Sequence, residues 1–197
     1  MADPIATKKS HRVYQVIDLK EVFGVSFKKN QELKQKIAQA LIDKMKERIE
    51  QGIGYDGQPM KAYSKEYKES DEYIAARKTG VVNMTLSGDM MGSIDVIKEK
   101  TNEIVIGFNQ REQELKANRH MRGEGGVPVR EFFGVSEDEI KEVKREFSSE
   151  LKDIKKDQSP SQGTGSVLLE ELRREISATD TFNGVFGNPI RVRFDEN

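Results

Sequence analysis

Apolar residues recur at every fourth position between Asn30 and about Gln51, with Lys and Glu between them. They are Leu33, Ile37, Leu41, Met45 and Ile49. Because side chains four residues apart share one face of an α-helix, this pattern predicts one long amphipathic helix. Gly52 and Gly54 follow directly, and glycine often ends a helix because it adopts the left-handed conformation at low cost.

A second helical pattern begins after Ser136. Ser136 and Glu139 have the spacing of a capping box, in which each side chain accepts a hydrogen bond from the other residue's backbone N–H. Asp138 adds negative charge near the positive end of the helix dipole. One apolar face follows, made of Ile140, Val143, Phe147, Leu151 and Ile154. The pattern therefore predicts a helix that continues to about Lys156.

Alternation of apolar and polar residues predicts strands in two regions. Residues 11–27 mix Val, Ile, Tyr and Phe with polar residues in partial alternation, which favours one strand or two. Val96 and then residues 103–108 show a clearer strand pattern, and residues 100–102 between them have the character of a hairpin turn. These regions predict a small antiparallel sheet.

Three shorter helices are expected between and after these strands. Ser64 predicts the start of a short helix that ends before Gly80, and Ser87 predicts the cap of a single turn that contains Met90 and Met91. Residues 109–122 contain strong helix formers but few apolar residues. We therefore expect this last helix to be exposed or to face a partner.

The clearest boundary is the segment DQSPSQGTGS, which contains no apolar residue and is typical of a linker. It divides the chain into an N-terminal strand segment (residues 1–29), a main domain (30–157), a linker (158–166) and a C-terminal arm (167–197). The overall prediction is an α+β fold: a small antiparallel sheet with a long amphipathic N-terminal helix, a C-terminal helix and an extended C-terminal arm.

The C-terminal arm is too small to bury a core of its own, so we expect it to dock on a neighbour. Leu168, Leu169, Leu172 and Ile176 have helical spacing, and Ile190, Val192 and Phe194 alternate with two arginines. A strand with this pattern can add to an exposed sheet edge through backbone hydrogen bonds. Ile190, Val192 and Phe194 are therefore predicted interface residues.

The segment VPVREFFG, residues 127–134, places apolar side chains in a connecting loop, where backbone polarity usually favours polar residues. Two interpretations are open. The apolar residues cap the end of the helix that follows, with Arg130 exposed, or Arg130 and a phenylalanine ring contact a neighbouring subunit. We expect a mixture, with Phe132 or Phe133 in the core and Arg130 at a subunit contact, and take all three as candidate interface residues.

Composition limits the possible functions. Hydrophobic residues make up 35% of the chain and charged residues 34%, so the core is expected to be modest. The 33 Lys and Arg nearly cancel the 34 Asp and Glu, and a net charge of -1 provides no general attraction for nucleic acid. The absence of cysteine excludes disulfides and thiol catalysis. No run of about 18 apolar residues occurs, so no membrane partner is predicted.

Candidate catalytic chemistry is sparse. His11 and His120 lie in different segments, and neither has a second ligand at metal-binding spacing. His120 is either a general base or, as we favour, a solvated helix residue. No phosphate-binding loop, zinc-protease motif or nucleophile elbow occurs. We therefore predict that the protein is not an enzyme, with no catalytic residue, metal or cofactor. A small metal-dependent hydrolase using acidic residues is the weakest alternative.

Three segments resemble the virion morphogenesis family of tailed bacteriophages, the Mu-like tail-completion or neck proteins. VPVREFFGVSEDEIKEV is similar to that family's Pro-x-Arg-Glu-Phe-Leu-Gly-Leu-Ser segment with its acidic helix start. YDGQPMKAYSKEYKE resembles its Asp-Gly-x-Pro loop, and VNMTLSGDMMGSIDV its Leu-x-x-Thr-Gly-x-Leu-x-x-Ser-Ile segment, with Ser87 in place of Thr and Met90 in place of Leu. The resemblance covers roughly residues 30–157.

The resemblance implies a structural protein of the head–tail junction, located in the virion and, during assembly, in the host cytoplasm. It implies an α+β subunit that forms a homo-oligomeric ring of six or a similar number of copies. Its partners would be the head connector or adaptor and the tail terminator or tail tube, with passing contact to the DNA in the channel. The alternative function is a DNA-binding or regulatory module, for which Arg111, Arg119 and Arg122 are the best support.

Overall fold

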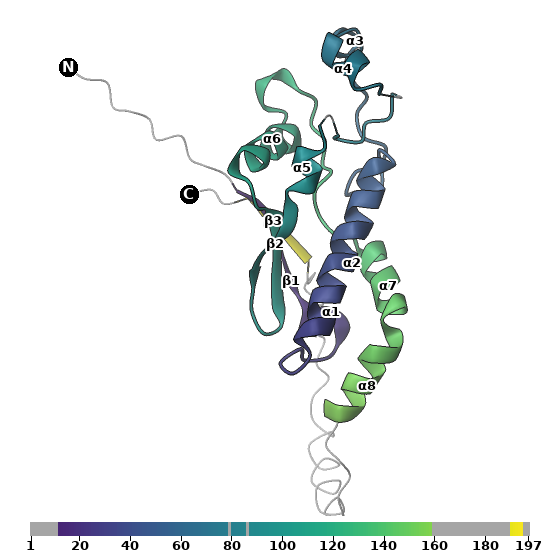
Figure 1. Ribbon diagram of the computed structural model, residues 1–197, viewed down its shortest axis with the longest axis vertical. Helices are drawn as coiled ribbons and strands as arrows, with labels where there is room; N and C mark the ends of the chain where they lie inside the picture. The colour runs from purple at the N-terminus through teal and green to yellow at the C-terminus, as the bar shows by residue number, and fades with distance from the viewer. Residues whose placement is uncertain (1–11, 79, 86, 159–189, 195–197) are drawn as a thin grey trace, which may run out of the picture.

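The computed structural model describes residues 12–78, 80–85, 87–158 and 190–194. Helices and a small antiparallel sheet form an α+β fold, as the sequence predicts (Figure 1). The predicted linker beyond Gln158 and the helix expected around Leu168 lie outside the described residues.

Four strands form the sheet, in the order β2-β3-β1-β4, and each neighbouring pair is antiparallel. They are β1 (Val13–Asp18), β2 (Ile94–Glu99), β3 (Glu103–Phe108) and β4 (Ile190–Phe194). β1 lies between β3 and β4, so the N-terminal strand segment is integral to the sheet.

The strand predicted at Ile190–Phe194 is confirmed as β4. Its backbone pairs with β1 of the same chain, with Phe194 opposite Val13 and Ile190 opposite Ile17. The docking of this arm on a neighbouring protein stays a prediction, as do the interface roles of Ile190, Val192 and Phe194.

The long helix α2 (Gln31–Glu50) matches the predicted helix closely. Ile37, Leu41, Met45 and Ile49 on its apolar face are fully buried in the core. The helix contacts both β2 and α7 (Glu137–Glu146). The helix therefore lies between the sheet and the C-terminal helices, and its apolar face contributes to the core (Figure 1).

A second strand within residues 11–27 was one of the two possibilities, and the structure instead forms the short helix α1 (Leu19–Phe23). The Asp18 carboxylate accepts a hydrogen bond from Glu21 N at 3.0 Å, which caps the helix directly at the end of β1. Gly24, in the left-handed conformation, ends it. Five residues are too few for helical periodicity to be distinguished from strand alternation.

Helices α3 (Lys65–Lys68) and α4 (Asp71–Ala75) form a lobe that projects from one end of the molecule (Figure 1). The side chains of Ser64 and Ser70 cap them by accepting hydrogen bonds from Tyr67 N and Tyr73 N. Neither helix buries a residue. We call residues 64–76 the α3–α4 lobe.

The single turn expected after Ser87 is α5 (Asp89–Gly92), and it buries Met90 and Met91. The expected cap is wrong by one residue. Gly88, with a φ of 92°, is the N-cap, while the Ser87 hydroxyl lies 2.6 Å from Asp89 Oδ2. The hydroxyl contacts a side chain of the first turn, where a capping residue would bond a backbone N–H.

Helix α6 (Arg111–Arg122) differs from its prediction, because one side of it is buried against the sheet and α5. Its buried side chains are Gln113, Glu114, Ala117, Asn118 and Met121. Three of these five are polar, so apolar periodicity did not reveal the buried face. Glu114 accepts a hydrogen bond from Val13 N at 3.1 Å, which fixes the helix to the start of β1.

After a turn of 3₁₀-helix, η1 (Glu124–Gly126), the helix predicted from Ser136 begins at Glu137 with both bonds of the capping box present. It is not continuous. α7 ends at Glu146, and α8 (Ser148–Gln158) continues beyond Phe147, whose φ and ψ are -95° and 19°. Leu151 and Ile154 of α8 are buried, as predicted. Of the helices that the structure describes, none is long and apolar enough to span a bilayer.

Candidate functional site

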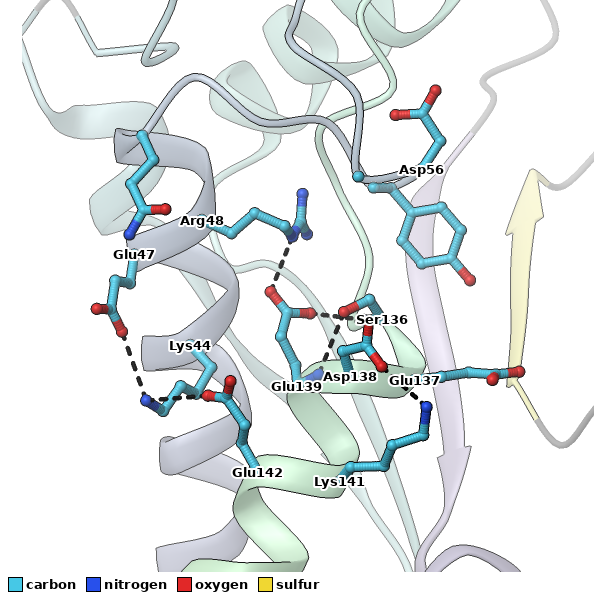
Figure 2. A pocket seen from close by; sticks show the side chains of 13 residues that line it. Lys44, Glu47, Arg48, Asp56, Ser136, Glu137, Asp138, Glu139, Lys141 and Glu142 are labelled. Carbon is cyan, nitrogen blue, oxygen red and sulfur yellow. Dashed lines mark hydrogen bonds and ion pairs between the residues drawn. The ribbon is translucent and has the colours of Figure 1, made fainter.

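Among the surface cavities of the described chain, two are lined by several charged side chains. The first, about 790 Å³, lies between α2, the turn at residues 55–57 and the start of α7 (Figure 2). We call it the acidic cavity, because six carboxylates and three basic side chains line it. They are Glu47, Asp56, Glu137, Asp138, Glu139 and Glu142, with Lys44, Arg48 and Lys141.

Arg48 and Glu139 form a nearly buried ion pair at the base of this cavity. Arg48 Nε donates to Glu139 Oε1 at 2.8 Å, and Glu139 Oε2 accepts from Ser136 N at 2.6 Å (Figure 2). The guanidinium also donates to the backbone carbonyls of three residues: Ile53, Phe132 and Gly134. Every charged atom of the pair is thus engaged in holding α2, the loop after it and α7 together.

The acidic cavity has the composition of a docking surface for a basic group. Both oxygens of its buried carboxylate are hydrogen-bonded, so Glu139 is not placed as a free acid or base. The remaining carboxylates line the outer part, where Lys44 pairs with Glu142 at 3.2 Å and Lys141 with Asp138 at 2.8 Å. Within the part of the chain that the structure describes, no cluster of three metal-ligating side chains occurs.

The second cavity, about 460 Å³, lies at the base of the α3–α4 lobe, where it meets α5, α6 and the loop at residues 126–130. Its apolar wall consists of Tyr63, Tyr67, Met84, Met90, Val127 and Pro128. Its basic side chains are Lys78, Lys116, His120 and Arg130. We call it the basic cavity, because none of its lining residues that the structure describes is an aspartate or glutamate.

Arg130 lines this cavity, and its side chain is nearly buried, with only 4% of the residue exposed. Its Nε donates to the carbonyl of Lys61 at 2.8 Å and its Nη2 to that of Ala62 at 3.2 Å. Its guanidinium lies 5.2 Å from the centre of the Tyr63 ring, within cation–π range. The side chain therefore holds the segment that leads into the lobe against the body of the protein.

His120 lies beside this guanidinium. Arg130 Nη1 is 3.4 Å from His120 Nδ1, and because arginine can only donate, Nδ1 must be the acceptor. The proton of the neutral imidazole is then on Nε2. Burial, and secondarily the positive charge of Arg130, lower the pKa of His120 below its usual 6.5, which favours this neutral form.

Tyr67 and Tyr73 of the lobe form a compact cluster with Tyr63, which Lys78 contacts. The rings of Tyr63, Tyr67 and Tyr73 lie 5.1–5.8 Å apart, mostly edge to face. Lys78 Nζ donates to Tyr63 Oη at 2.8 Å and to Asn83 Oδ1 at 3.2 Å. Burial lowers the pKa of Lys78 and raises that of Tyr63. This cluster is the main attachment of a lobe that has no core of its own.

Gln113 supplies the one buried amide of the cavity wall. Its side chain is in α6, 6% exposed, and its Oε1 has no hydrogen-bond partner among the described residues. A buried polar atom without a partner costs about 1–3 kcal/mol. The atom therefore marks a position where a donor from outside the chain would be stabilising.

The structure buries Phe132, Phe133 and Arg130 within the single chain, and a role for them at an interface stays a prediction. Phe132 and Phe133, 0% and 1% exposed, both pack in the core, and Phe133 lies 5.2 Å from the Phe108 ring. Arg130 is enclosed by its own chain, and was expected at a subunit contact. A neighbouring subunit would have to unpack the core to reach either phenylalanine, whereas Arg130 lines the basic cavity. The physical reason is that the loop packs against its own chain: Phe133 against Phe108, and Arg130 against the carbonyls of Lys61 and Ala62.

Sequence reasoning missed most of the basic cavity. Gln113, Lys116 and His120 are three and seven residues apart on one face of α6, a spacing that could have revealed a shared surface. Lys78 and Tyr63 gave no such signal, because only the folded lobe brings them to the same place.

No protein-family model, curated protein or solved structure matches this chain.

We expect the free energy of unfolding to fall between pH 7 and pH 5, and His120→Gln to reduce that fall. The folded-state pKa of His120 lies below 6.5, so the unfolded chain takes up a proton first as the pH drops. The stabilisation is complete above about pH 6.5 and lost below it, with a slope of at most about 1.4 kcal/mol per pH unit. Glutamine does not titrate, so the variant removes this pH dependence whatever its absolute stability. Urea unfolding of both proteins at several pH values isolates the histidine, and parallel curves would contradict the assignment.

Proposed function

We propose that this chain is a structural protein of a tailed bacteriophage, which assembles as a ring at the head–tail junction and joins the head connector to the tail. The sequence resemblance supports this proposal, and the fold brings the three segments that carry it together. Arg130, in VPVREFFGVSEDEIKEV, donates hydrogen bonds to the carbonyls of Lys61 and Ala62, in YDGQPMKAYSKEYKE. Met84 and Met90, in VNMTLSGDMMGSIDV, line the same cavity as Arg130.

The α3–α4 lobe supports a role in assembly. Helices of four and five residues are unstable in water unless tertiary contacts hold them, and these two bury none of their residues in the isolated chain. Ile74 on α4 is 62% exposed. A neighbouring protein that covered the lobe would bury this side chain and supply the missing contacts.

The observation that carries the ring proposal is the placement of two faces of unlike charge. A closed ring requires a heterologous contact, in which one surface of a subunit meets a different surface of the next. The acidic cavity is lined by residues of α2 and α7, and α6, which carries the exposed Arg119, lies on the other side of α2 from α7 (Figure 1). Subunits placed head to tail would bring these faces together.

Charge reversal at Glu137 tests this contact. Glu137 lines the acidic cavity in the first turn of α7, and Glu150 occupies the first turn of α8 outside it. We expect sedimentation velocity and negative-stain microscopy to show a ring that dissociates toward 1 M salt, where the Debye length is about 3 Å. Glu137→Lys should raise the protein concentration needed for ring assembly about tenfold or more, because it removes at least one ion pair across a partly buried contact. Glu150→Lys is the matched control and should leave it intact.

Equal assembly of both variants would remove the acidic cavity from the contact. The location in the particle is tested separately: phage lacking this protein should accumulate heads and tails that are not joined. Normal particles from such a phage would refute the junction role. In the alternative, a DNA-binding module, the protein would retard duplex DNA at low salt and release it steeply as salt rises.

A further inference from the structure

The basic cavity has features that ring assembly does not explain. The chain contains 34 aspartates and glutamates, yet the described lining of this cavity has four basic side chains and no carboxylate. Lys116 forms no ion pair with any residue that the structure describes. The positive charges of Lys78 and Arg130 lie on the same cavity beside the neutral His120, and burial, which disfavours a positive charge, lowers the pKa of all three groups. An anion in the cavity would offset these positive charges.

Hydrogen-bond donors remain available for that anion. A guanidinium has five N–H donors, and Arg130 engages three of them with Lys61, Ala62 and His120. The neutral His120 ring, which accepts at Nδ1, offers its Nε2–H. Planar guanidinium groups bind carboxylates and phosphates through paired hydrogen bonds, so either anion would satisfy this part of the site.

Gln113 narrows the choice of ligand. Its buried Oε1 has no partner among the described residues and requires a donor, which a simple carboxylate lacks at neutral pH, while inorganic phosphate offers a P–OH donor but no apolar group for the wall. An N–H close to the carboxylate of the ligand would supply this donor. The wall of Tyr63, Tyr67, Met84 and Met90 adds a third requirement, an apolar group.

We infer that the basic cavity binds the C-terminal residue of a partner polypeptide. Such a residue carries the carboxylate, the amide N–H and an apolar side chain on a single α-carbon. Its carboxylate would lie among Arg130, His120 and Lys116, its N–H would donate to Gln113 Oε1, and its side chain would contact the tyrosine and methionine wall. An internal aspartate or glutamate offers the carboxylate on its side chain and needs a second residue for the apolar contact.

The test uses N-acetyl-L-phenylalanine as the probe, because it contains these three groups and little else. Titration of the full-length protein, followed by calorimetry and by ¹H–¹⁵N spectra, should give a dissociation constant of about 0.1–1 mM, the range expected for a ligand of this size. The Gln113 side-chain amide and the backbone of residues 126–130 should shift. N-acetyl-L-phenylalaninamide, which lacks only the charge, should bind about tenfold more weakly or worse, because a charged hydrogen bond is lost.

Lys116→Gln should weaken binding of the acid about threefold or more, since one charged donor is removed from a partly screened site. Lys116 is exposed, so the substitution leaves the fold intact. Arg119→Gln is the matched control, because Arg119 is an exposed basic residue of α6 that does not line the cavity. Gln113→Leu should weaken the binding of the acid and of its amide to the same extent, because both compounds donate the same N–H to Gln113.

Three outcomes would overturn the inference. The acid and its amide could bind equally, or the spectral shifts could lie away from the cavity. Neither compound could bind at about 10 mM, a concentration some tenfold above the expected dissociation constant. Competition by inorganic phosphate with equal affinity would show a general anion site and also refute it. An amidated peptide with an internal glutamate next to phenylalanine that binds as well would do the same. These titrations do not depend on the ring, so they can fail while the proposed assembly stands.

Discussion

Replacing Arg48 by methionine is expected to lower the free energy of unfolding by about 3–5 kcal/mol, the range for removing one partner of a buried ion pair. The substitution leaves Glu139 charged and 7% exposed, with Oε1 unpaired. It also removes the donors to the carbonyls of Ile53, Phe132 and Gly134. Methionine fills much of the same volume, so the loss reports the polar contacts and not a cavity. Urea denaturation followed by circular dichroism measures it.

Two controls separate the buried pair from charge in general. Lys44→Met removes a cation that pairs with Glu142 on the same two helices but in a more exposed position, and it should change stability by about 0–1 kcal/mol. Glu139→Gln added to Arg48→Met removes the stranded charge and should recover part of the loss. If Arg48→Met were no more destabilising than Lys44→Met, the ion pair would not be the contact that fixes α2 to α7.

Phe132→Ala is expected to lower the free energy of unfolding by about 3–5 kcal/mol, as other fully buried phenylalanines do. The ring is 0% exposed and belongs to the same core as the apolar face of α2. Alanine leaves a cavity that the surrounding helices and sheet can fill only partly. Val129→Ala is the control from the same loop, because Val129 is 47% exposed and should have an effect within about 0.5 kcal/mol.

This substitution also distinguishes the two roles considered for the segment. A core residue changes the stability of the dispersed chain, whereas an interface residue changes assembly and leaves the unfolding of the monomer unaltered. Chemical denaturation at protein concentrations below assembly gives the first quantity, and sedimentation gives the second. A loss below about 1 kcal/mol, together with failed assembly, would restore Phe132 to the interface.

The sequence determined the elements whose signals are local or strictly periodic. Four-residue spacing identified α2 almost to its ends, since the apolar face of a long helix repeats often enough to be unmistakable. The capping box at Ser136 located the start of α7, because both of its bonds form between residues three positions apart. The β2–β3 hairpin and the strand at Ile190–Phe194 followed from alternation, and together these elements fixed the α+β class.

Only the tertiary structure decided where Arg130 lies, that α6 is half-buried, and that a basic cavity exists. Each depends on partners far along the chain: Arg130 on carbonyls some seventy residues before it, and Glu114 of α6 on the backbone of β1. The buried faces involved are largely polar, and a buried polar side chain looks like an exposed one in a hydrophobic pattern. Hydrogen-bond satisfaction, which no local pattern encodes, placed these residues inside the molecule.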